Sequence, residues 1–132
     1  MNAKTIQKYN KYTVSKLIKK AQEKFNRFIR ERDLQHNDMF VCISCKGVKP
    51  KSQMNAGHYY PAGTCGALRF NENNVHGQCI KCNYHQHGNL TPYRKHLIEK
   101  IGLKEVERLD MMSKQPFKHD RIKLIELIEQ YK

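Results

Sequence analysis

Two cysteine pairs with the same spacing are the residues of this sequence best suited to a defined chemistry. They are Cys42-Ile-Ser-Cys45 and Cys79-Ile-Lys-Cys82. Two residues between the cysteines of a pair let a tight turn point both sulfur atoms the same way, and two such pairs complete a tetrahedral zinc shell of four thiolates. A redox dithiol would need only one pair in a βαβ setting. We therefore predict a structural Zn²⁺ on these four thiolates, with an iron–sulfur site as the alternative.

The polar residues around these pairs include the types that phosphodiester hydrolysis requires. That reaction needs a base for water and a divalent cation to offset charge on the phosphate. His58 lies between the pairs, and a neutral imidazole can accept the proton of water. Asn83 follows the last cysteine and can offer a carbonyl oxygen to Mg²⁺. Asn74 can orient the strand that carries His58 through hydrogen bonds. We predict catalytic roles for these three residues.

The rest of the cation shell is less defined by the sequence. His87 lies four residues after Asn83, so both can face one cation if a helix begins there. Participation of a histidine would favour Mn²⁺ or another borderline metal over Mg²⁺. The plainer alternatives are a buried structural role for His58 and turn or helix capping for the two asparagines. The remaining histidines of this region and of the next helix are expected to be polar surface or capping residues: His76, His85 and His96.

Composition indicates a polyanionic partner. The chain has 132 residues, with 25 Lys and Arg against 12 Asp and Glu, and a formal net charge of +13. Each basic side chain near a phosphate releases condensed counterions, so such an excess favours nucleic acid. No apolar run approaches the roughly 20 residues of a membrane-spanning helix, and the first residues lack a secretory apolar region. We expect a cytoplasmic protein with no membrane attachment, in which the thiols stay reduced.

Hydrophobic periodicity divides the chain into three segments, with an α+β class overall. Residues 1–36 form a basic N-terminal helical arm, frayed over 1–13 and helical from Val14. Residues 37–90 form the zinc-held core, with short strands at 39–41 and 67–70. Residues 91–132 form C-terminal helices, the first capped by Thr91 with Pro92 in its first turn and stopped by Gly102.

Basic residues concentrate in the N-terminal segment. Residues 1–35 hold ten Lys and Arg and three Asp and Glu, a net charge of +7. The plain interpretation is a solvated helix face, and the functional one is a surface that contacts phosphates. The candidates for DNA contact are Lys16, Lys19, Lys20, Lys24, Arg27, Arg69 and Arg94.

Several segments resemble known families. The histidine after the first cysteine pair, the asparagine before the second and Asn83 after it resemble zinc-containing HNH (ββα-metal) nucleases, and the last also resembles the phage endonuclease VII group. SKLIKKAQEKFNRFIRERD, AGHY, LRFNENN-HGQC-KCN and GNL-PYR-HLIEKIG are similar to the phage NinG/Rap recombination proteins over about residues 15–110.

The resemblance implies an activity. It implies a small ββα-metal core held by a zinc on four cysteines, and a metal-dependent endonuclease that cuts branched recombination intermediates such as Holliday junctions and D-loops in phage recombination. The source would then be a phage or prophage. Cutting two opposed strands favours a homodimer. One departure is Gly57, where many HNH enzymes carry a metal-binding aspartate, and it keeps open the alternative of a non-catalytic zinc-knuckle recombination mediator.

Overall fold

A long basic helix organises the fold. The computed structural model describes all 132 residues. Helix α1 (Ala3–Lys8) is followed by α2 (Val14–Asp33), which is capped by the Thr13 side chain and carries the expected apolar stripe. The buried residues of that stripe are Leu17, Ala21, Phe25 and Ile29. The periodicity over 14–29 therefore predicted this helix correctly.

The middle of the chain forms two small antiparallel sheets. Strands β1 (Met39–Val41) and β2 (Val48–Pro50) make the first, and β3 (Met54–His58) and β4 (Val75–Cys79) make the second. A π-helical turn, η4 (Lys81–His85), follows β4. In the second sheet His58 is opposite Val75, and Met54 is opposite Cys79. The two ends of this hairpin therefore carry different residues: His58 at one end and the second cysteine pair at the other.

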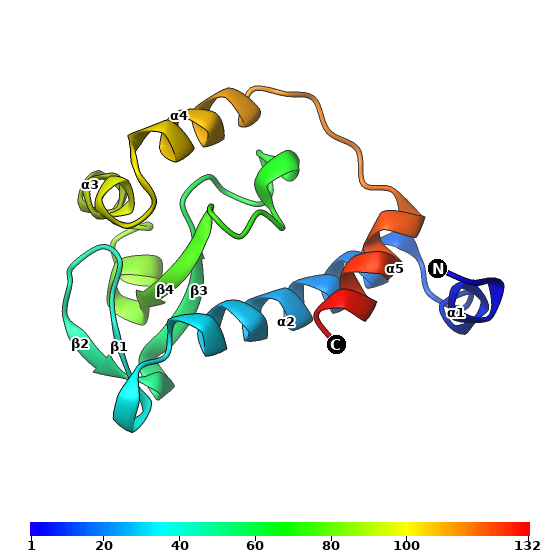
Figure 1. Cartoon of the computed structure of the whole chain (residues 1–132), viewed down its shortest axis with the longest axis horizontal. Coiled ribbons are helices and arrows are strands. Elements are labelled where there is room, and N and C mark those ends of the chain that lie inside the picture. The colour runs from blue at the N-terminus through cyan, green and yellow to red at the C-terminus, as the bar shows by residue number, and fades with distance from the viewer.

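Three helices complete the chain. They are α3 (Leu90–Ile101), α4 (Leu103–Met112) and α5 (Arg121–Gln130). Gly102, with φ of 94°, ends α3 and begins α4, as its predicted role as a stop requires. The helix begins one residue before Thr91, after Asn89 in the left-handed conformation, so the predicted cap is displaced. Figure 1 shows α3 near the strands, α4 above the turn of residues 66–68, and α5 lying along α2.

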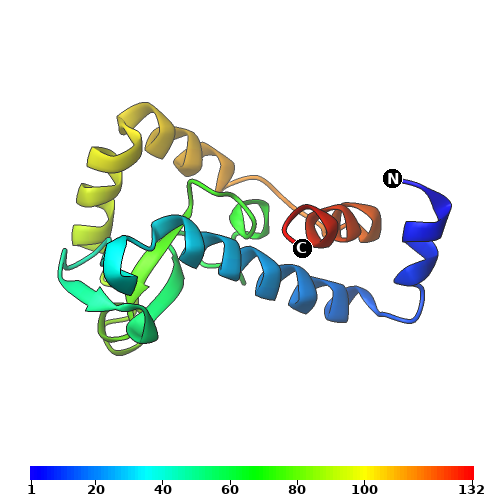
Figure 2. The same cartoon turned by 60° about the horizontal axis from the view of Figure 1, so that its bottom comes forward.

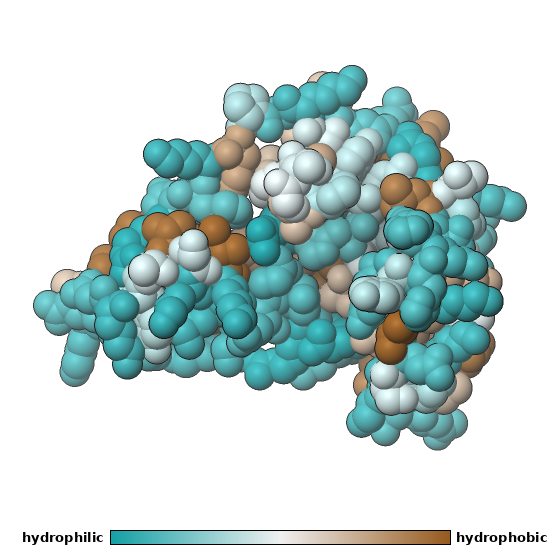
Figure 3. All heavy atoms as spheres, turned by 180° about the vertical axis from the view of Figure 1, so that it is seen from behind, coloured by the Kyte–Doolittle hydropathy of each residue, from teal (hydrophilic) through white to brown (hydrophobic).

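The buried apolar residues form several small clusters and no single large core. Residues of α1, α2 and α5 pack together at one end of α2, where the buried residues are Tyr9, Leu17, Ala21, Leu124, Ile125 and Ile128. Near the other end, Val75 of β4 packs against Phe25 and Ile29. Figure 2 shows α2 running from the strands to α1. Seen from behind, most of the surface is hydrophilic, with hydrophobic residues in small patches (Figure 3). No helix is both long enough and apolar enough to cross a membrane.

Two local expectations are wrong. Residues 3–8 form a helix although we expected 1–13 to be frayed, because Tyr9 packs into the α2–α5 core and Asn2 caps the helix. Residues 66–68 form a 3₁₀ turn although we expected a strand at 67–70, because the apolar Leu68 is buried by a turn and has no strand partner. Both errors depend on contacts with distant parts of the chain.

Candidate functional site

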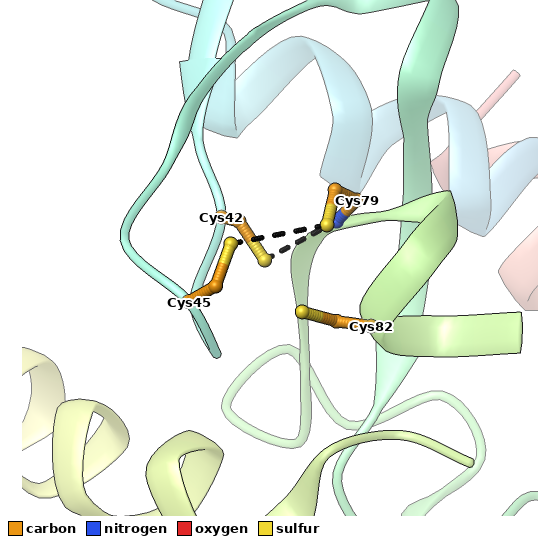
Figure 4. Close-up of side chains that lie close together, drawn as sticks. All are labelled: Cys42, Cys45, Cys79 and Cys82. Carbon is orange, nitrogen blue, oxygen red and sulfur yellow. Dashed lines mark hydrogen bonds between the residues drawn. The ribbon is translucent and has the colours of Figure 1, made fainter. Parts of the chain in front are cut away.

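The four predicted zinc ligands come together. Cys42 and Cys45 lie in the turn after β1, and Cys79 and Cys82 lie where β4 meets η4. Their sulfur atoms are all within 4.8 Å of one another, and the Sγ atoms of Cys45 and Cys79 are 3.9 Å apart. Zinc–sulfur bonds of about 2.3 Å in a tetrahedron put sulfur atoms about 3.8 Å apart. The cluster is therefore consistent with a structural zinc (Figure 4).

The surroundings of the cluster suit a structural cation. Three of the cysteines are buried and only Cys45 is exposed. Burial raises the pKa of the Cys82 thiol to about 12, so a cation is needed to hold this sulfur as a thiolate. Cys65 lies outside the cluster as a half-buried free thiol, with its sulfur beside Thr64. No second group of three His, Cys, Asp or Glu ligands is present in the chain.

His58 is held in one tautomer at the end of β3. Its Nε2 atom is 3.0 Å from the carbonyl oxygen of Arg69. A carbonyl can only accept, so Nε2 carries the proton and Nδ1 keeps its lone pair. Burial lowers the pKa of His58, and the nearby charge of Arg69 adds to this effect. The imidazole is therefore neutral near pH 7 and has a free acceptor nitrogen.

Asn74 fixes the loop that follows His58. It is fully buried, and its Oδ1 accepts a hydrogen bond of 2.9 Å from the Tyr60 amide. Its Nδ2 donates to the carbonyl oxygens of Tyr60 and Leu68 at 3.0 and 3.2 Å. The Tyr59 amide also donates to the Asn74 carbonyl. These bonds hold the loop after His58; the side chain of Asn74 does not bond to β3 itself, so its role in orienting His58 stays a prediction.

The two faces of the β3–β4 hairpin carry different groups, because successive strand residues point to opposite faces. Ala56 and His58 share a face with Val75, which packs on α2. Gly57 and His76 are on the other face, where the Tyr93 hydroxyl donates to the Gly57 carbonyl at 2.6 Å. His58 consequently lies on the face that α2 covers.

Gln78 occupies the space beside Gly57. A Cβ atom on Gly57 would stand 2.8 and 2.9 Å from Cβ and Cδ of Gln78. The Gln78 side chain is fully buried, and its Nε2 donates to the Ser44 hydroxyl and the Gly88 carbonyl at 2.9 and 2.6 Å. Its Oε1 has no hydrogen-bond partner. The aspartate of many HNH enzymes would have no room here. Sequence reasoning missed Gln78, because only the strand register places it next to Gly57.

The two predicted cation ligands lie in different local structures. Asn83 lies inside η4, is half-buried and forms no side-chain hydrogen bond. His87 is exposed and lies beyond the turn, with φ of 50°, so the expected one-turn spacing within a helix is absent. No hydrogen bond joins either residue to His58. Their role in binding a cation stays a prediction.

His76 differs from the expected surface or capping histidine, because it is 2% exposed. Its Nε2 donates to the Asn73 carbonyl at 2.8 Å, and its Nδ1 accepts from Lys100 and Arg32 at 2.9 and 3.2 Å. Burial first, and then the charge of Lys100, lower its pKa to about 3. His76 is therefore a neutral structural residue inside a charged cluster.

The predicted DNA-contacting residues are spread over several elements. Lys16, Lys19 and Arg27 are exposed on α2, and Lys20 and Lys24 are half-buried there. Arg69 donates to Gln22 at 2.7 Å. Arg94 forms a two-pronged ion pair with Asp110, at 2.9 and 2.8 Å. The last two guanidinium groups already have partners within the chain.

Comparison with known proteins identifies the family. The family model described as Bacteriophage Lambda NinG protein matches residues 2–132. The chain belongs to the NinG family. The match includes α1, α2 and the C-terminal helices as well as the cysteine cluster, which extends the resemblance expected from the sequence.

Curated NinG proteins are similar over much of the chain. Protein ninG of Salmonella phage P22 and that of Escherichia phage lambda are each 47% identical over 93 residues, covering 70% of this chain and 43% of each relative. Protein ninG of Escherichia phage 933W is 46% identical over 93 residues. The aligned part is less than half of the length of these NinG relatives. No solved structure matches the chain.

Proposed function

We propose that this NinG-family chain is a metal-dependent, structure-specific DNA endonuclease that acts on branched recombination intermediates. The observation that carries the proposal is the state of His58: a neutral imidazole with Nε2 held by the Arg69 carbonyl and Nδ1 free. In this proposal β3, β4 and the helical turn that follows correspond to a ββα-metal arrangement with a zinc on the four cysteines.

His58 would act as a general base. Its Nδ1 accepts a proton from a water molecule, and the water oxygen forms a bond to phosphorus. The phosphorus–oxygen bond to the leaving sugar oxygen breaks, and that oxygen takes its proton from solvent. The hydrogen bonds of Asn74 to Tyr60 hold the loop next to His58, so Asn74 is a positioning residue.

A divalent cation would offset the charge that develops on the phosphate and on the leaving oxygen. The free amide of Asn83 fits this task, because carbonyl oxygens are ligands that Mg²⁺ and Mn²⁺ accept and no residue of the chain occupies it. His87 is the second candidate. With Gln78 against Gly57, position 57 supplies no carboxylate, so phosphate and water would complete the shell.

A preference for branched DNA and a homodimer belong to the same proposal. Two opposed nicks require two sites, and a symmetric dimer supplies them. The net charge of +13 supports a polyanionic substrate. Light scattering on the purified chain and on its complex with junction DNA tests the dimer. A single chain in both samples would contradict it.

Cleavage of a synthetic four-way junction tests the chemistry. The chain is incubated with the junction and Mg²⁺ or Mn²⁺, next to His58→Ala and the control His36→Ala, which alters an exposed histidine. We expect cleavage by the original chain and the control, and a loss of about 100-fold or more in His58→Ala with binding retained. Equal cleavage by all three proteins would remove His58 from the mechanism, and equal affinity for junction and linear duplex would remove the branched-DNA preference.

A non-catalytic recombination mediator is the second candidate. The specific observation in its favour is that Gln78 fills the place of the usual aspartate. It predicts tight junction binding with no cleavage in either cation, and binding that is unchanged in His58→Ala.

A further inference from the structure

A concave surface at the far end of α2 gathers lysines from several segments. It is a groove of about 390 Å³ between α1, α2 and α5. We call it the lysine groove and define it by Lys8, Lys11, Lys20, Lys24 and Lys132. Only Lys20 and Lys24 are among the DNA-contact candidates predicted from the sequence. The other three lysines come from segments outside α2.

The charges of the groove are poorly balanced within the chain. Glu129 pairs with both Lys8 and Lys132, at 3.7 and 3.4 Å. The groove also contains Glu23, which forms no ion pair. The remaining lysines of the groove have no carboxylate partner: Lys11, Lys20 and Lys24. Five ammonium groups thus converge with two carboxylates, and this favours an anionic ligand.

Aromatic rings hold the lysine side chains in place. The Nζ atoms of Lys20 and Lys11 lie 4.6 and 5.3 Å from the centre of the Tyr12 ring. The Nζ atom of Lys8 lies 5.4 Å from the centre of the Tyr9 ring. A cation over an aromatic face is attracted to it, and the apolar stem packs on the ring. The ammonium groups are therefore partly ordered before a ligand arrives.

Hydrogen bonds join the frame of the groove to the rest of the fold. Arg121 of α5 donates to the carbonyl oxygens of Tyr12 and Tyr9, both at 2.7 Å. At the other end of α2, Asp33 accepts a hydrogen bond of 2.7 Å from the Gly77 amide in β4.

The thirteen steps from Lys20 to Asp33 rise about 20 Å along α2 at about 1.5 Å per residue. Phe25 packs against Val75, which is opposite His58. The five steps from Lys20 to Phe25 rise about 8 Å. Figure 1 shows α1 and α5 beside one end of α2 and the strands at its other end.

We infer that the lysine groove is a second DNA site, which binds the phosphate backbone of a duplex arm away from the β3–β4 hairpin. The inference rests on the proposed function for the identity of the polyanion. The hairpin contacts α2 at about 8 to 20 Å from Lys20, which corresponds to about two to six base pairs at about 3.4 Å each, so one duplex arm can reach both regions. Lysines act as point charges on phosphates, so the groove would bind without sequence preference.

Charge removal in the groove tests the inference. The triple variant Lys11→Gln/Lys20→Gln/Lys24→Gln is compared with Lys104→Gln/Lys114→Gln/Lys118→Gln, which removes the same charge from exposed lysines without ion pairs. Binding to a fluorescent duplex is measured by anisotropy over a salt series with no added divalent cation. Helical content and bound zinc of both variants are measured to establish that each is folded.

The expected result is specific to the groove. Its triple variant should bind the duplex about tenfold or more weakly, with a slope of log affinity against log salt that is shallower by about 2 to 3. The control triple should lose less than half as much. Equal losses in the two variants, or an unchanged slope in the groove variant, would overturn the inference. So would tighter groove-dependent binding of single-stranded RNA or phosphatidylserine vesicles than of duplex DNA.

Binding without added divalent cation separates this inference from the proposed activity. If the original chain cuts no junction but only the groove variant loses duplex binding, the nuclease proposal fails and the groove stands. If the original chain cuts junctions and the groove variant binds and cuts equally well, the groove inference fails and the nuclease proposal stands.

Discussion

Gln78 and Gly57 share a space in which only one side chain fits. A Cβ atom on Gly57 would come within 2.8 Å of Cβ of Gln78, whose amide is buried and hydrogen-bonded to Ser44 and Gly88. Glycine at position 57 is therefore a packing requirement of this fold. An aspartate at position 57 would collide with the Gln78 side chain.

Substitution of Gly57 should destabilise the protein. We expect Gly57→Ala to lower the free energy of unfolding by about 1 to 3 kcal/mol, because the added methyl group overpacks the site. Gly63→Ala is the matched control, with nothing within 4 Å of its Cβ, and should change it by less than about 0.5 kcal/mol. Urea denaturation measures both. Gly57→Asp should likewise be destabilised, and adding Gln78→Gly should recover part of the loss. A fully stable Gly57→Asp would show that Gln78 does not occupy this space.

Loss of one cluster cysteine should remove the metal. We expect about one zinc per chain, and Cys79→Ser should lose it and unfold cooperatively at a much lower temperature, because a closed zinc shell needs all four ligands. Cys65→Ser should keep both the metal and the melting temperature, since Cys65 lies outside the cluster. Elemental analysis and circular dichroism make the comparison. Zinc retained by Cys79→Ser would contradict the assignment of all four cysteines as ligands.

Asn74 should contribute to stability as well as to position. Asn74→Ala removes three hydrogen bonds at a fully buried site, so we expect a loss of about 2 to 4 kcal/mol in the free energy of unfolding. The neighbouring Asn73→Ala loses one side-chain bond, of 3.4 Å to Glu105, and should cost under about 1 kcal/mol. Chemical denaturation distinguishes them. Similar values for the two variants would show that the contacts of Asn74 carry little energy.

The pH dependence of cleavage should reflect the lowered pKa of His58. Its ordinary value is 6.5, and burial lowers it. The base is active when neutral, so the single-turnover rate should decline at acid pH with a midpoint below 6.5. Rates in Mg²⁺ over a pH series provide the measurement. An acid limb at or above 6.5 would be inconsistent with a buried His58 as the base.

Protonation of His76 should make folding sensitive to acid. The unfolded chain binds this proton at a pKa of 6.5 and the folded chain at a pKa of about 3. The free energy of unfolding therefore decreases as the pH is lowered from 6.5 to 3. From about pH 8 to about pH 5 the contribution is about 2 kcal/mol. His76→Gln should remove that part of the slope in urea denaturation, whereas His85→Gln, at an exposed position, should leave it unchanged. Equal slopes in the two variants would contradict the buried state of His76.

The sequence by itself determined the features that depend on local spacing. The two cysteine pairs specified the four-cysteine cluster, because two intervening residues fix where the sulfur atoms of a pair point. The apolar period from Val14 to Ile29 specified α2, because a helix places such residues on one side. The family followed from motifs that lie within short segments. His58 and Asn74 could be selected as candidates by residue type and position, while their roles remain predictions.

Only the tertiary structure decided what depends on contacts between distant residues. The register of β3 and β4 puts Gln78 against Gly57, and the packing of Tyr9 on α2 and α5 orders a helix that looked frayed. The carbonyl of Arg69 sets the tautomer of His58 from eleven residues away. Lys8 and Lys132 meet because both chain ends pack beside α2. These contacts join residues with no fixed separation along the chain, so spacing alone could not predict them.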